Sequence, residues 1–291
     1  MPLRSLWKLG IGGFLIIAFG CTPEWGMEPS EMASVSDGSP AWSPSGRLVA
    51  YVHTNPIEPS TGKPSGLYLL DLHTGVERLL LAEPFLFSPS WSPDETHLAF
   101  ADFNGIWSIR ADGDSLRAVY PQGGWPNWLP DGRSILFGIN GELQTIAIGD
   151  TSPAIVGISG FFFDLQLCRN GQEVLACTYP GGGRPPEICR ISLPAGQVTL
   201  LTSDDIDDRS PACGATGQVV WSRWPTDSKR VHPEIWIMDS TGTGRRRLAS
   251  VDSNMSWNPT GTAFVFSGHT VAGPRLFVMN ADGSGLRELT R

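Results

Sequence analysis

One turn motif recurs six times along this chain of 291 residues, and an internal repeat constrains a fold more than any single motif does. Each copy starts with an aromatic or apolar residue and, in most copies, continues through Pro, Asp or Asn to Gly. The first positions of successive copies are 49, 37, 39, 46 and 44 residues apart, with a mean of 43. The six copies are Trp42-Ser-Pro-Ser-Gly46, Trp91-Ser-Pro-Asp-Glu95, Trp128-Leu-Pro-Asp-Gly132, Leu167-Cys-Arg-Asn-Gly171, Cys213-Gly-Ala-Thr-Gly217 and Trp257-Asn-Pro-Thr-Gly261. The chain therefore repeats one small unit of supersecondary structure.

Short apolar segments follow every turn and predict strands. Three of them, rich in β-branched and aromatic residues, can be placed after the turn in each copy. The 34 glycines and 24 prolines leave no stretch without them longer than 14 residues, so long helices have little room. A period of about 40–50 residues is typical of one β-propeller blade. We predict an all-β fold, a six-bladed β-propeller of four-stranded antiparallel blades, at about 40–81, 88–120, 125–158, 162–202, 210–250 and 254–290.

A Pro-x-Trp sequence leads into the turn at Pro40, Pro89 and Pro126. Proline at the first residue of a strand removes no ladder hydrogen bond, and the tryptophan offers a large surface to bury between neighbouring blades. Together with Ile235-Trp-Ile-Met-Asp239 and Leu286-Arg-Glu-Leu-Thr290, these motifs resemble the WD-like repeats of TolB-type propellers. The resemblance covers residues 40–291.

The resemblance implies a propeller but only part of what TolB-type proteins contain. Those proteins carry an α/β domain before the propeller, and residues 22–39 are too few for one. The resemblance therefore implies a propeller-only lipoprotein relative. It identifies no residue of this chain as a contact residue of the family. We therefore do not infer the role of TolB in the Tol-Pal envelope system for this chain.

The amino terminus has the order of a secretory signal over residues 1–20. Two basic residues come first, an apolar run follows from Leu9 to Phe19, and a glycine precedes Cys21. The run is too short for a transmembrane helix. The four residues ending at Cys21 resemble a bacterial lipobox, although Phe19 stands where a small residue is preferred. An ordinary cleaved signal and a lipoprotein signal with Cys21 lipidated both fit, and we expect export to the periplasm or cell surface with a lipid anchor in a bacterial membrane.

Two ways of closing the ring fit the sequence. Because every copy runs through four strands, blade six can lie against blade one without a shared strand. Alternatively, Met32-Ala-Ser-Val35, which resembles Leu248-Ala-Ser-Val251, adds an outer strand there. We favour a tether over 21–39, because its composition is polar.

Charge and motif content exclude several classes of function. The net charge of −8 and a single basic run, Arg245 to Arg247, argue against a nucleic-acid partner. The sequence contains no Gly-x-Ser-x-Gly elbow, no Walker loop and no dinucleotide-binding glycine motif. We predict no cofactor.

Four cysteines lie beyond Cys21, at Cys168, Cys177, Cys189 and Cys213. Their spacing matches no zinc motif. An oxidising compartment permits a disulfide, but its connectivity does not follow from sequence. We expect four buried free thiols, because all four fall within predicted strands, and leave a Cys177–Cys189 bond open.

The loops between second and third strands share one face with the connections between blades. Those expected at 53–66, 178–186, 223–233 and 268–274 are long, and long loops are often functional. The residues that we predict for a binding face are His53, Tyr179, Trp224, His232 and His269.

Two sites of other kinds are weighed against that binding face. Histidines at the funnel suit a metal or acid–base site. Since no carboxylate stands at a matching position, we assign no metal or catalytic residue. Ser203-Asp-Asp-Ile-Asp-Asp208 offers oxygens to calcium, but its spacing is not that of an EF-hand, so we favour a solvated acidic loop.

The function that we predict is non-catalytic. The chain is expected to be a binding or scaffold protein of the cell envelope that presents the loop-rich face to a protein, peptide or glycan. The alternative is a metal-dependent polysaccharide lyase or hydrolase at the funnel, because some pectin-degrading lyases resemble this class of propeller and hold a metal by histidines.

Overall fold

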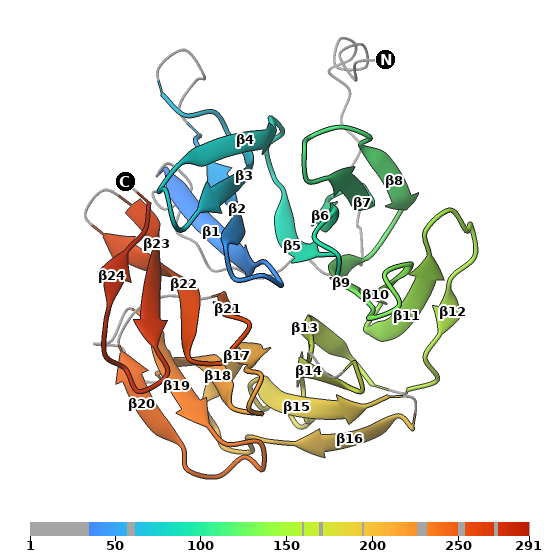
Figure 1. Cartoon of the computed structure of the whole chain (residues 1–291). Coiled ribbons are helices and arrows are strands. Elements are labelled where there is room, and N and C mark those ends of the chain that lie inside the picture. The colour runs from blue at the N-terminus through green and yellow to red at the C-terminus, as the bar shows by residue number, and fades with distance from the viewer. Residues whose placement is uncertain are drawn as a thin grey trace, which may run out of the picture.

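The strands form a ring of six sheets, seen along its axis in the computed structural model of Figure 1. The structure describes residues 35–56, 62–158, 160–168, 171–193, 195–225, 232–249, 254–270 and 273–290. Each sheet holds four antiparallel strands in chain order, such as β1-β2-β3-β4. The predicted six-bladed β-propeller is therefore confirmed.

Each blade begins at the axis and ends at the rim. The innermost strands contact one another around the ring. They are β1 (Ser36–Trp42), β5 (Phe87–Trp91), β9 (Gly124–Trp128), β13 (Phe162–Leu167), β17 (Asp207–Cys213) and β21 (Met255–Trp257). The second strands are β2 (Leu48–Thr54), β6 (His97–Asp102), β10 (Ser134–Ile139), β14 (Glu173–Thr178), β18 (Val219–Trp224) and β22 (Ala263–Thr270).

The outer strands become shorter and more exposed toward the rim. The third strands are β3 (Gly66–Asp71), β7 (Gly105–Arg110), β11 (Glu142–Ala147), β15 (Glu187–Ser192), β19 (Glu234–Met238) and β23 (Gly273–Asn280). The fourth strands are β4 (Glu77–Leu81), β8 (Arg117–Tyr120), β12 (Ala154–Ile155), β16 (Gln197–Leu200), β20 (Arg246–Ala249) and β24 (Arg287–Glu288). Short edge strands are one way in which proteins limit edge-to-edge pairing.

The buried core lies between the blades. Its described residues fall into six hydrophobic clusters, one at each junction. Alternate residues of a strand point to opposite faces of the sheet. Ala50 and Val52 accordingly pack toward blade two, whereas Val49 and Tyr51 pack toward blade six. Because its side chains alternate in direction, one strand contributes apolar side chains to the cores of two junctions.

A left-handed residue recurs within or directly before every innermost strand. The six are Ser39, Ser88, Trp125, Asp164, Ser210 and Asn254, with φ between 47° and 63°. The pairing register shifts at this point in the first five blades. A bulge bends its strand and re-aims the residues beside it. A non-glycine residue in this conformation costs on the order of 1 kcal/mol or more. The packing of the ring therefore has to offset this cost at each of the six positions.

In five of the six blades, the residue before the first position of the turn motif links neighbouring blades near the axis. Where it is Ser256, Ser90 or Asn127, its side chain accepts a hydrogen bond from the backbone N–H of the next blade, at 2.9, 3.2 and 2.9 Å. Where it is alanine, as at Ala41 and Ala212, its carbonyl accepts a hydrogen bond of 3.0 Å from the indole of the next tryptophan. The tryptophans therefore lie between blades, as predicted.

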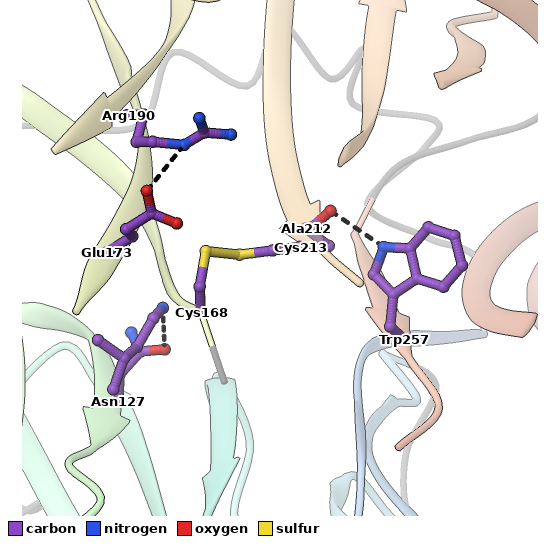
Figure 2. Close-up of a disulfide and its surroundings, with 8 residues drawn as sticks. Asn127, Cys168, Glu173, Arg190, Ala212, Cys213 and Trp257 are labelled. Atoms are coloured by element: carbon purple, nitrogen blue, oxygen red, sulfur yellow. Dashed lines mark hydrogen bonds and ion pairs between the residues drawn. A yellow bond between two sulfur atoms is a disulfide. The ribbon is translucent and has the colours of Figure 1, made fainter. Parts of the chain in front are cut away.

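A disulfide joins blade four to blade five (Figure 2). Cys168 directly follows β13, Cys213 ends β17, and their Cα atoms are 5.6 Å apart. The prediction of four free thiols is therefore wrong for these two residues, because innermost strands of neighbouring blades converge at the axis. It is confirmed for Cys177 and Cys189, which are buried and free. They pack into the clusters on opposite faces of blade four and are not paired with each other.

The ring closes without a shared strand in the described residues, because each sheet consists of four consecutive strands. We call the junction between blades six and one the seam. Across it, Ser267 donates a hydrogen bond of 2.7 Å to the carbonyl of Asp37. The Arg275 guanidinium donates one of 3.3 Å to the carbonyl of Val35. These contacts link segments more than 200 residues apart.

The amino-terminal predictions lie mostly outside the described residues. These are the signal over 1–20, Cys21 and Met32 to Ser34 of the alternative seam strand. Because β1 begins at Ser36, residues 36–39, predicted as part of the tether, belong to blade one. Among the described residues, no helix has the length and apolar character needed to cross a membrane.

Candidate functional site

One face of the ring carries the loops between second and third strands together with the connections between blades. We call it the loop face. The second and third strands are farthest apart in sequence in blades one, four and five, where 11, 8 and 9 residues separate them. The long loop predicted at 268–274 is wrong, since β22 and β23 pair as far as Thr270 and Gly273. Blade six therefore projects a strand hairpin.

His53 does not lie in a loop, which corrects the sequence prediction. It belongs to β2, is only 4% exposed, and its Nδ1 lies 2.7 Å from Oδ1 of Asp37 on β1. Asp37 is the carboxylate that the sequence reasoning did not find, because it meets His53 only through strand pairing. Burial opposes ionisation of Asp37, but hydrogen bonds from His53 and Thr290 hold its pKa below the usual value. The pair anchors the loop-face end of blade one.

The structure brings His232 and His269 together. Their ring centroids are 4.9 Å apart, and both side chains are exposed on blades five and six. Trp224 ends β18 and is half-buried. Tyr179 follows β14 and is 49% exposed.

Tyr179 belongs to a larger set of aromatic side chains on the loop face of blades two to four, which we call the aromatic arc. The set is Phe85, Phe87, Phe103, Trp125, Phe161, Phe163 and Tyr179. Four of its rings are strongly exposed: Phe103 is 77%, Phe85 63%, Tyr179 49% and Phe161 41% accessible. Large contiguous apolar patches on a protein surface commonly mark an interaction site.

Ring contacts join the arc into two groups, one around blade two and one on blades three and four. Phe103 lies 5.7 Å from Phe85 and 6.2 Å from Phe87, measured between ring centroids. Phe163 stacks on Tyr179 at 5.4 Å and contacts Trp125 at 6.4 Å. Between these groups, a side chain built on Gly124 would lie 3.7 Å from the Phe87 ring, so Phe87 reaches the strand that carries Trp125.

A sequence signal for the arc existed but was not used. An aromatic residue lies directly before the left-handed residue in blades two and four and is that residue in blade three, and the run from Phe161 to Phe163 shows the pattern most clearly. Only the topology places the start of an innermost strand beside the turn between second and third strands of the same blade. Phe103 in such a turn then meets Phe87.

A cavity of about 370 Å³ lies on the axis. All six innermost strands line it, with tryptophans and the turn prolines Pro44, Pro93 and Pro130 among its walls. These prolines belong to the turns after the first strand, so the cavity extends toward the face opposite the loop face. None of the five predicted binding residues lines it.

Asp164 is the acidic residue in the cavity wall. Burial raises the pKa of its carboxyl, although the backbone N–H of Ser210 donates to it at 3.1 Å. The thiol of Cys177 lies 3.7 Å from the same oxygen. Asp164 thus joins blade four to blade five beside the axis.

Charged residues also gather on the loop face between blades four and five. Arg223 on β18 is 9% exposed and donates to both oxygens of Asp208 at 2.7 Å, and to Asp204 at 2.8 Å. The indole of Trp221 donates a further bond of 2.8 Å to Asp208. The predicted solvated acidic loop is therefore partly buried and paired.

Comparison with known proteins shows the fold. No family model matches the sequence. The uncharacterized peptidase YuxL of Bacillus subtilis (strain 168) is 27% identical over 224 residues, which is 71% of this chain and 32% of YuxL. The structure of TolB from Acinetobacter baumannii matches 87% of this chain and 62% of that chain, at 19% identity and a TM-score of 0.65. An oligogalacturonate lyase in complex with manganese matches 88% of this chain and 78% of that chain, at 13% identity and a TM-score of 0.54.

These matches differ in how much of each relative the chain represents. It spans about a third of the length of YuxL and less than two thirds of the TolB chain. Structural similarity at identities below 20% identifies an architecture rather than an activity. This chain has the TolB-like six-bladed β-propeller fold.

Proposed function

We propose that this protein is a non-catalytic binding propeller of the cell envelope whose aromatic arc docks a protein partner. The observation that carries the proposal is the exposure of four arc rings on one face. Aromatic anchors contribute much of the binding energy at protein interfaces. The blades hold the arc on a rigid frame, which reduces the entropy lost on binding.

The chemistry of the arc favours a protein partner over a glycan. Three of its four most exposed rings are phenylalanine, which offers apolar surface but no hydroxyl or indole donor. A glycan presents hydroxyl groups that need hydrogen-bond partners. Apolar side chains of a polypeptide have no such need.

Variants of the arc test this function. Replacing Phe85 and Phe103 together by alanine should weaken partner binding by at least about tenfold, the effect expected on removing interface anchors. The matched control replaces Val76 and Ile155, which are 62% and 64% exposed outside the arc, and should leave binding unchanged.

Photo-crosslinking from position 103 in cell envelopes would identify the partner, with position 155 as the control site. The affinity of that partner for each variant would then be measured by titration. Equal affinities for the arc and control variants would contradict the proposal. Retention of the wild type, but not of the arc variant, on a glycan array would assign a glycan instead.

The lyase or hydrolase alternative rests on a different observation, the contact between His232 and His269 at 4.9 Å. Two imidazoles can contribute to a metal site. Elemental analysis of the purified protein and of a His232→Ala, His269→Ala variant discriminates the two functions. Stoichiometric metal that is lost from the variant, together with polysaccharide cleavage, would favour the enzyme.

Export and lipidation at Cys21 belong to the same proposal, and the support comes from the sequence of residues 1–21. Metabolic labelling with a fatty acid should mark the wild type and not a Cys21→Ser variant. An unlabelled protein that is still exported would indicate an ordinary cleaved signal.

A further inference from the structure

Three carboxylates meet where blade four joins blade five on the loop face. Glu187 is the first residue of β15, Asp204 lies in the connection to blade five, and Asp208 lies on β17. One oxygen from each lies within 4.8 Å of the others. In the described part of the chain, this is the one group of three potential ligands that are so close.

Glu187 differs from its two neighbours because it has almost no partner. Its side chain is fully buried, and neither carboxylate oxygen accepts a hydrogen bond of normal length. The nearest cation is Arg184, at 3.5 Å, and that side chain is 39% exposed and shared with Asp205. Asp208, in contrast, accepts bonds from Arg223 and Trp221.

The surroundings penalise a charged Glu187. Burial, reinforced by Asp208 and Asp204, raises its pKa to about 7, although Thr202 and Arg184 act in the opposite direction. A buried carboxylate without hydrogen-bond partners is costly to ionise. Among the described cations, Arg184 alone lies within 4 Å of Glu187, and its exposure to solvent weakens that interaction.

The charge and size of the group fit a divalent cation. Arg223 is the buried guanidinium beside the three carboxylates. Arg184, 3.5 Å from Glu187, and Arg245, 3.7 Å from Asp204, are 39% and 32% exposed, so solvent screens their charges. Oxygen ligands at about 2.3–2.6 Å from Ca²⁺ lie up to roughly 5 Å apart, which accommodates the observed 4.8 Å limit. The Asp204 side chain is 37% exposed, so a cation can enter from solvent.

We infer that Glu187, Asp204 and Asp208 bind a divalent cation of the calcium class, which fastens the connection between blades four and five. Hard cations prefer such all-oxygen sites. The site is independent of the aromatic arc and goes beyond the proposed function.

Calcium titration of the full-length protein tests the inference, after chelator treatment and exchange into chelator-free buffer. Isothermal titration should show one Ca²⁺ bound per chain and weaker binding of Mg²⁺, which tolerates only tighter octahedral geometry. Millimolar CaCl₂ should also raise the melting temperature by several degrees, because a ligand that binds only the folded state stabilises it.

Glu187→Gln separates cation binding from a purely structural role. It should abolish the calcium-dependent rise in melting temperature. The matched control is Asp205→Asn, in the same loop and 90% exposed, which should respond to Ca²⁺ as the wild type does.

Two results would overturn the inference. Absence of both heat and thermal shift in the wild type would mean that Glu187 is simply protonated in the folded protein. An unchanged calcium response in Glu187→Gln would place the cation elsewhere. Should that variant fail to fold, Asp204→Asn, which removes a partly exposed ligand, should weaken Ca²⁺ binding at least about tenfold.

Discussion

The junction between blades four and five and the seam between blades six and one are held by different means. The first contains a disulfide, the buried carboxyl of Asp164, and the ion pair between Arg223 of blade five and Asp204 of the connection, beside the Arg223–Asp208 pair within blade five. The seam has hydrophobic packing and hydrogen bonds such as Ser267 to Asp37, besides the His53–Asp37 pair within blade one.

The difference teaches that ring closure does not depend on a special fastening at the seam. Ser256 joins blade six to Trp42 with a hydrogen bond of 2.9 Å, as Ser90 and Asn127 do at ordinary junctions. The covalent bond lies elsewhere, between blades that are already neighbours in sequence. Repeated packing between blades therefore closes the ring.

The largest effect is expected from breaking the charged network of the blade four–five junction. Arg223→Ala should reduce the free energy of unfolding by about 3–5 kcal/mol, because it leaves Asp208 buried without its counterion. Urea denaturation measures this loss. Arg47→Ala removes an ion pair whose arginine side chain is 65% exposed, and should cost less than about 1 kcal/mol. Equal losses in the two variants would contradict the prediction that the buried ion pair contributes more to stability than the exposed one.

The disulfide should contribute slightly less than the ion network. Replacing Cys168 and Cys213 by alanine should lower the free energy of unfolding by about 2–4 kcal/mol, because the bond restricts a 45-residue loop in the unfolded chain. Reductant should destabilise the wild type similarly and leave the double variant unaffected. A wild type that is insensitive to complete reduction would refute this role.

A single hydrogen bond at the seam should contribute less again. Ser267→Ala removes the donor to the Asp37 carbonyl and should cost about 1 kcal/mol. Thermal unfolding of this variant beside Ser284→Ala, which lies in an exposed turn of the same blade, measures the difference. A loss above that of Arg223→Ala would show that the seam is the decisive junction.

The smallest effect concerns pH. Since the pKa of Asp37 is lower in the folded than in the unfolded protein, the unfolded chain binds more protons as pH falls below about 4. The stability that Asp37 contributes is present above that range and lost below it. Asp37→Asn should therefore flatten part of the loss of stability between pH 4 and pH 2, which denaturation at fixed pH would measure. If the variant lost as much stability in acid as the wild type does, the predicted contribution of the His53–Asp37 pair would be contradicted.

Local features of the sequence predicted the architecture. Turn residues, period-two alternation and a mean spacing of 43 residues specify blades without knowledge of what each blade touches. The turn motif from Trp91 to Glu95, for example, is followed by the strand β6 over His97–Asp102. The signature tryptophans were likewise placed between blades, because so large an apolar ring needs a partner surface.

Contacts across blades could not be predicted in this way. Cys168 and Cys213 are 45 residues apart, and nothing in their spacing distinguishes them from Cys177 and Cys189. Their pairing follows from the convergence of innermost strands at the axis. The aromatic arc depends on the same geometry, since the start of one strand and the turn between two others meet only in the folded blade.

The sequence by itself determined the all-β class and the number of blades, because these depend on interactions between near neighbours along the chain. Only the tertiary structure decided that His53 is buried against Asp37, that the carboxylate of Glu187 has no hydrogen-bond partner, and that four aromatic rings share one face. Those properties depend on how six similar sheets are rotated about one axis, and that rotation brings together residues whose separation in sequence carries no information about their distance in space.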